Sequence, residues 1–194
     1  IENLIDDQNE SEQWQIDDYV EFFLGEEVSK SAEDIDWNDG KMHWYYEELD
    51  VSGGYANITG AVEGWQEFVL YRLENGQDLV LTKSVGCGPA CDYHHVFYQG
   101  EGEEVREIQI NEVLPMNELD VQITKLQSLA LKDDAYPIDY PEDHQIDCIF
   151  PKKGTQLKVD LVLGADERRM ALADLSWNKI EFSVEKVYET IIER

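Results

Sequence analysis

The feature that most constrains the fold is a series of short apolar and aromatic runs, separated by turn-forming residues, that begins at about residue 41. Two of these turns are Ser52-Gly53-Gly54 and Asn75-Gly76. Asn-Gly between alternating apolar runs is the strongest short-range signal of a β-hairpin. The pattern predicts an antiparallel β-meander over about 41–110.

The Asn75-Gly76 turn also predicts a register for its hairpin. A two-residue loop would place Leu73 opposite Asp78 and Tyr71 opposite Val80. Both faces of the hairpin would then be apolar, so we expect it near the centre of a sheet that is covered on both sides. One face would carry Val69, Tyr71, Leu73 and Val80, and the other would carry Phe68, Leu70, Leu79 and Leu81.

A second β-rich unit is predicted over about 144–186, with turns at 151–154, 164–169 and 178–179. The segment between the two units interrupts the strand pattern. Residues 116–132 fit either a helix after Pro115 or a short helix and a strand, and 186–194 fit either a strand or a helix. We expect both units to share one large, mainly antiparallel sheet.

The N-terminal region predicts one helix. Residues 1–11 are too polar to pack and are expected to form a flexible lead-in. Apolar side chains from Trp14 to Leu24 predict a helix over about 12–24 that ends at Gly25. The predicted architecture is a single α+β domain, 12–194, with this helix packed on the sheet.

Charge excludes two classes of partner. The chain has 43 acidic and 15 basic residues, which give a formal net charge of -28. Such a surface repels nucleic acids and anionic membranes, and it suits solubility, salt tolerance or cation binding. The sequence contains no apolar run of the length that spans a bilayer, so no transmembrane segment is predicted.

The segment Cys87-Gly88-Pro89-Ala90-Cys91 allows three interpretations. It fits a disulfide that clamps a turn between two strands, in an oxidising compartment. It differs by one residue from the CGPC redox motif, and an aromatic strand follows it where that motif requires a helix. It could also bind zinc or copper together with His94 or His95, although strand alternation places these two histidines on opposite faces. The third cysteine, Cys148, lies in an apolar strand and is expected to be a buried thiol.

Asp34, Asp36 and Asn38 form a second candidate metal site. Their alternate spacing is similar to the start of an EF-hand loop, which binds calcium through oxygen ligands. The glycine comes one residue late, at Gly40, and Tyr45 stands where a glutamate should complete the site. An acidic loop without a cation is the simpler interpretation.

Aromatic residues near the cysteine turn form a candidate binding surface, for which we select Trp65, Tyr93 and Tyr98. The partner would be an unidentified protein or small molecule. No nucleophile motif and no catalytic residue are predicted, and the sequence favours a protein that is not an enzyme.

Several of these turns together resemble a known group of proteins. The GCGPAC turn after an Asn-Gly hairpin, the strand pair that begins at FPKKGT and the closing LSWN turn resemble uncharacterised bacterial secreted or lipid-anchored proteins. The resemblance covers about 41–185. It implies an extracytoplasmic α+β protein with Cys87 and Cys91 paired, and it supplies neither an activity nor a cofactor.

The expected function follows from these observations. We expect a binding or structural module in the periplasm, at the cell surface or secreted, with metal binding as the main alternative. Because the chain begins at Ile1, a leader or a lipid anchor upstream of this residue fits the same location.

Overall fold

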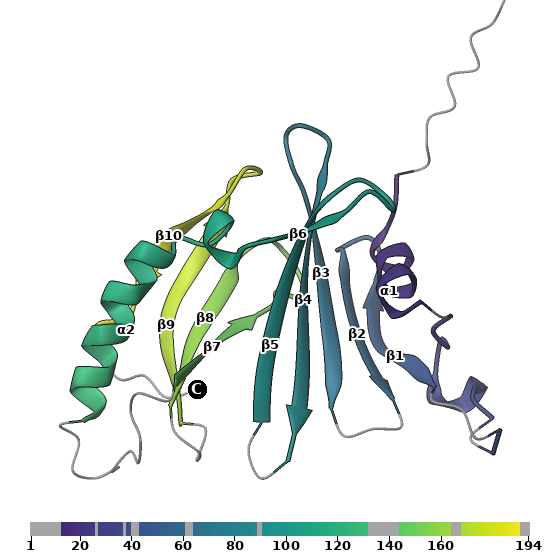
Figure 1. The fold of residues 1–194 in the computed structure, drawn as a ribbon, viewed down its shortest axis with the longest axis horizontal. Coiled ribbons are helices and arrows are strands. Elements are labelled where there is room, and N and C mark those ends of the chain that lie inside the picture. The colour runs from purple at the N-terminus through teal and green to yellow at the C-terminus, as the bar shows by residue number, and fades with distance from the viewer. Residues whose placement is uncertain are drawn as a thin grey trace, which may run out of the picture.

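The computed structural model describes residues 13–25, 27–36, 38–39, 43–60, 64–88, 91–131, 144–163 and 168–190. Its strands form two antiparallel sheets, and a helix packs against each of them (Figure 1). The predicted α+β class with an antiparallel meander is confirmed. The expectation that both β-rich units share one sheet is wrong, because the two units form separate sheets. The predicted lead-in, 1–11, lies outside the described residues.

The larger sheet is the predicted meander, since its six strands follow one another in chain order and each pairs antiparallel with the next. The strands are β1 (Trp44–Asp50), β2 (Tyr55–Gly60), β3 (Trp65–Arg72), β4 (Asp78–Cys87), β5 (Cys91–Gly100) and β6 (Arg106–Ile108).

The hairpin between β3 and β4 differs from the predicted register by one residue. Tyr71 lies opposite Leu79 rather than Val80. Leu73 donates its N–H to the Gln77 carbonyl at 2.9 Å, and Gly76, with a φ of 86°, occupies the left-handed position of a three-residue loop. A shift of one residue turns side chains to the opposite face. The face directed at the smaller sheet therefore carries Val69, Tyr71, Leu79 and Leu81, and the face directed at the N-terminal helix carries Phe68, Leu70 and Val80.

The smaller sheet has the strand order β10-β9-β8-β7. Its strands are β7 (His144–Ile149), β8 (Leu157–Leu163), β9 (Arg168–Trp177) and β10 (Phe182–Val187). The predicted turn at 164–169 was too long, because Arg168 and Arg169 already belong to β9. Residues 188–190 after β10 are neither helix nor strand.

The first helix, α1 (Ile16–Leu24), covers the outer face of the larger sheet. Its buried Ile16 and Val20 pack with Ala56, Ile58 and Phe68 of that sheet. The helix begins at residue 16 rather than 12, because Gln15 has an extended backbone and caps the helix. The Gln15 N–H donates to Asp18 Oδ2 at 2.7 Å. Gly25, with a φ of 68°, ends the helix as predicted.

The second helix, α2 (Met116–Ala130), settles the alternative that the sequence left open for the middle segment. Leu119, Ile123 and Leu126 lie one turn apart and are buried against the smaller sheet. A strand in this segment is therefore excluded up to Ala130.

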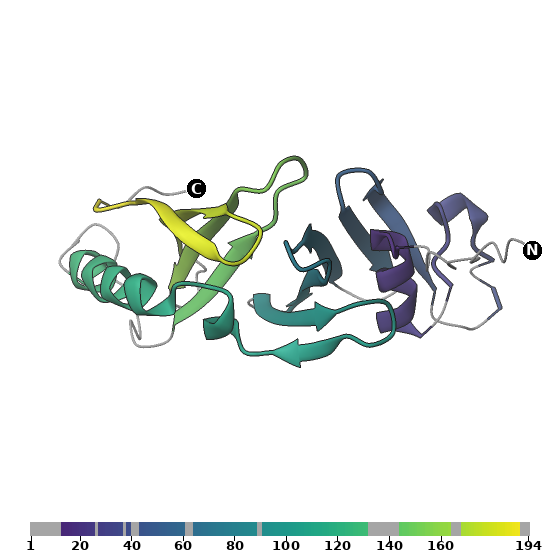
Figure 2. The same ribbon diagram turned by 90° about the horizontal axis from the view of Figure 1, so that it is seen from above.

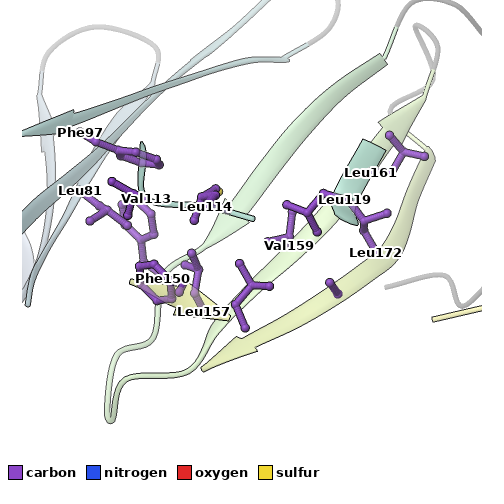
Figure 3. Close-up of a cluster of buried hydrophobic side chains, with 14 of the residues drawn as sticks. Leu81, Phe97, Val113, Leu114, Leu119, Phe150, Leu157, Val159, Leu161 and Leu172 are labelled. Atoms are coloured by element: carbon purple, nitrogen blue, oxygen red, sulfur yellow. The ribbon is translucent and has the colours of Figure 1, made fainter. Parts of the chain in front are cut away.

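One hydrophobic core joins the two sheets. Leu81 and Phe97 of the larger sheet and Phe150 and Leu157 of the smaller unit belong to the same buried cluster (Figure 3). Leu119 of α2 belongs to the same cluster and extends it to that helix. Seen from above, the smaller sheet and α1 lie on opposite sides of the larger sheet (Figure 2). The central hairpin is consequently covered on both sides, as predicted.

Candidate functional site

The cysteine turn lies at the tip of the hairpin between β4 and β5. Cys87 and Cys91 are opposite each other in the strand register, and their sulfur atoms are 2.04 Å apart, at disulfide distance. A loop this short contributes little to stability through chain entropy, so the bond mainly fixes the shape of the tip. β5 begins at Cys91, so the helix on which a redox function depends is not there.

The structure does not bring the predicted zinc or copper ligands together. His94 is exposed and lies opposite Ser84, whereas His95 is opposite Lys83 on the other face. The cysteine sulfurs are bonded to each other. Among the described residues, no group of three or more His, Cys, Asp or Glu side chains is arranged to hold a metal ion.

The predicted calcium ligands are engaged locally. Asp34 ends a short 3₁₀ helix, Ala32–Asp34, and accepts a hydrogen bond from Ser31 Oγ at 3.0 Å. Asp36 Oδ1 accepts one from the Asn38 N–H, also at 3.0 Å. These bonds describe an ordinary turn, and calcium binding stays a prediction.

The three predicted aromatic residues do not share one surface. Trp65 Nε1 donates to Glu67 Oε1 at 3.2 Å, and the Arg169 guanidinium lies 4.8 Å from the centre of the Tyr93 ring. Both residues belong to the face that meets the smaller sheet. Tyr98 points to the opposite face, where its ring centre is 4.3 Å from that of Phe23 in α1. Their role in binding stays a prediction.

Five ionisable side chains meet between the two sheets, a site that the sequence analysis did not predict. We call it the ionic junction; it consists of Glu67, Lys83, His95, Asp147 and Arg169. Its members come from five strands, β3, β4, β5, β7 and β9.

The ionic junction exists because β7 is an edge strand that is buried against the larger sheet. β7 pairs with β8 on one side only. On its other side, the Cys148 N–H donates to His95 Nε2 at 3.1 Å, and Lys83 Nζ donates to the Cys148 carbonyl at 3.4 Å. Side chains of the larger sheet thus satisfy main-chain groups that would otherwise be buried without partners.

The charges of the ionic junction balance each other at close range. Lys83 Nζ lies 2.9 Å from Glu67 Oε2 and 3.4 Å from Asp147 Oδ1. Arg169 Nη1 donates to Asp147 Oδ2 at 2.5 Å. Asp147 is 1% exposed and Lys83 5%, so neither charge could be buried without these partners.

The pKa of Asp147 shows that its ionised form is favoured. Burial raises this pKa, but the contacts with His95, Lys83 and Arg169 lower it by more, so that the pKa lies below its usual value. The nitrogen His95 Nε2 lies 3.5 Å from Asp147 Oδ1 and also accepts the Cys148 N–H. Nε2 can accept from Cys148 only while it carries no proton; with a proton, in the neutral Nε2–H tautomer or in the charged ring, it would donate to Asp147 instead.

The ionic junction offers no free nucleophile. The Cys148 thiol lies in the hydrophobic core and is fully buried, and burial raises its pKa to about 12. Only its main-chain N–H reaches His95, so no thiol-imidazole pair forms. The arrangement holds two sheets together, and its groups are directed at one another.

A sequence signal for the ionic junction did exist. Lys83 interrupts the apolar strand 78–85, and Asp147 interrupts the strand 144–150. A charged residue inside an apolar run that is covered on both faces needs a buried partner of opposite charge. The partners themselves are far apart in sequence, so the pattern could not have identified them.

Comparisons with known proteins identify no family. No family model matches the chain, and no curated protein matches it. A solved structure described as a domain of an uncharacterized protein from Porphyromonas gingivalis W83 is similar, with a TM-score of 0.45 and 11% identity. The match covers 84% of each chain. This degree of similarity supports no argument about function.

Proposed function

We propose that this chain is an extracytoplasmic binding module. Two observations support the proposal. The ionisable groups gathered between the sheets are engaged with one another, and Phe22 of α1 lies at the surface beside the half-buried Trp14. Phe22 is 41% exposed and its ring centre is 5.5 Å from that of Trp14. Exposed aromatic groups are a common feature of partner surfaces.

The compartment is supported by the cysteine pair at disulfide distance, since such bonds persist mainly in oxidising environments. In the described part of the chain, no helix is long and apolar enough to cross a bilayer. A net charge of -28 disfavours nucleic acid as the partner.

Fractionation of the producing cells, combined with thiol alkylation, tests the compartment. We expect the protein outside the cytoplasm, with Cys87 and Cys91 resistant to maleimide until a reductant is added. A cytosolic protein with both cysteines alkylated would overturn the proposed location. Photo-crosslinkers placed at Phe22 and, for comparison, at Ile180 test binding in the same cells, because only the first position should capture a discrete partner.

A further inference from the structure

The surface around Trp14 combines aromatic rings with carboxylates. Trp14 packs edge-on against Tyr19 and Phe22, with ring centres 5.1 Å and 5.5 Å apart. Asp18 is one helical turn before Phe22, so both lie on the same side of α1. Phe22 and Asp18 are exposed, and Trp14 is half-buried.

A second segment adds more negative charge beside the indole. In the turn after β5, Gly102 lies so close to Trp14 that a Cβ built on it would be 3.5 Å from the indole nitrogen. The neighbouring residues Glu101, Glu103 and Glu104 are exposed. Arg72, which donates to the Trp14 carbonyl, is ion-paired with the buried Asp78 and does not neutralise this surface.

A hollow of about 390 Å³ lies next to the indole. It is lined by Gln13, Trp14, Gln15, Asp17, Asp18 and Val51. Asp17 Oδ1 is buried and forms no hydrogen bond with any described residue. The two carboxylates outweigh the partial positive charge, about half an elementary charge, of the α1 N-terminus. The hollow is therefore negative and has an aromatic wall.

We propose that this surface, defined by Trp14, Asp17, Asp18, Phe22 and Glu101–Glu104, binds an arginine-bearing segment of a basic partner protein. A guanidinium is planar, stacks on aromatic faces and pairs with carboxylates, so it matches both components of the surface. The strongly negative charge of the whole chain would steer such a partner toward it. This inference rests on the proposed binding function and names the class of partner.

The test compares fluorescein-labelled deca-arginine and deca-lysine by fluorescence anisotropy at physiological salt. Both peptides carry the same charge, so non-specific attraction to an acidic protein affects them alike, whereas stacking favours arginine. We expect deca-arginine to bind at least about threefold more tightly than deca-lysine. Phe22→Ala should remove most of this preference, whereas Asp17→Asn should weaken the binding of both peptides.

Matched controls are available on the other side of the molecule. Ile180 is 61% exposed, and Asp120 is an exposed carboxylate on α2. Ile180→Ala removes an exposed apolar side chain and Asp120→Asn an exposed carboxylate, and both should leave the arginine preference unchanged. Circular dichroism melting curves of all four variants establish that each is folded.

Three outcomes would overturn the inference. The first is equal affinity for the two peptides. The second is that the test and control variants lose the arginine preference equally. The third is that the protein sediments as a dimer that depends on Phe22, because a second copy of the chain would then occupy this surface. If the peptides fail while a crosslinker at Phe22 still captures a partner in cells, the class of partner is wrong and the binding function stands.

Discussion

Replacing Lys83 with methionine tests whether the ionic junction holds the two sheets together. Two unit charges 2.9 Å apart, as Lys83 and Glu67 are, attract each other by about 6 kcal/mol at an effective dielectric constant of about 20, and desolvation offsets much of this. After Lys83→Met, Asp147 keeps Arg169 as a partner, whereas among the described residues Glu67 keeps the hydrogen bond from the Trp65 indole N–H alone. Leaving a fully buried charge without its partner costs about 3–5 kcal/mol, and because the Glu67 side chain is 16% exposed we expect a loss toward the lower end of that range.

The assay is urea unfolding followed by tryptophan fluorescence and circular dichroism, with the free energy of unfolding extrapolated to water. The matched control is Lys152→Met. Lys152 pairs with Glu48 at the surface, where the side chains are 62% and 40% exposed, so its loss should cost less than about 1 kcal/mol. Adding Glu67→Gln to Lys83→Met should recover part of the lost stability, because it removes the charge left alone. Equal losses for Lys83→Met and Lys152→Met would refute the reasoning.

Three further predictions concern pH, thiols and backbone. The pKa of Asp147 is lowered in the fold, so its stabilising contribution is present above the ordinary carboxyl pKa of about 4 and is lost as pH falls below it. Unfolding free energies of wild type and Asp147→Asn should therefore converge toward acid pH, and parallel curves would contradict this assignment. Without reductant, denatured protein should show one reactive thiol, Cys148, and native protein none; three reactive thiols would exclude the disulfide. Gly76→Ala should cost about 1–2 kcal/mol, because Gly76 has a positive φ but open space around its Cα. Gly64→Ala should cost clearly more in the same urea assay, since its Cβ would lie 2.2 Å from the Val85 carbonyl oxygen, and similar losses would contradict the predicted clash.

The elements of this fold could be predicted from sequence because their signals are local. Turn residues such as Gly25 and Gly76 indicate where the first helix and a strand of the central hairpin end. The middle segment, in which Leu119, Ile123 and Leu126 lie one turn apart in α2, stayed open between a helix and a short helix with a strand. The hairpin register could not be obtained in the same way. Asn-Gly fits both a two-residue and a three-residue loop. The three-residue loop is the one that pairs Tyr71 with Leu79, and both side chains are buried in the core shared with the smaller sheet.

The ionic junction depends on contacts between residues far apart in the chain. Lys83 and Asp147 are separated by the whole of α2, and nothing in either local sequence indicates that their strands meet. The division into two sheets was missed for the same reason. In the structure, β7 lies against the face of the larger sheet instead of pairing with one of its edge strands. The alternation of side chains along a strand is the same in both arrangements, so the sequence pattern cannot distinguish them.

The buried outer edge of β7 has a consequence for the handling of truncated forms. A fragment comprising residues 144–190 would lack His95 and Lys83, so the main-chain groups of Cys148 would face solvent on an unpaired strand. Such an edge recruits strands from other molecules, and the newly accessible Cys148 thiol would allow intermolecular disulfides. The larger sheet therefore protects its neighbour from aggregation, and domain dissection between the two sheets should yield oligomers rather than a soluble half.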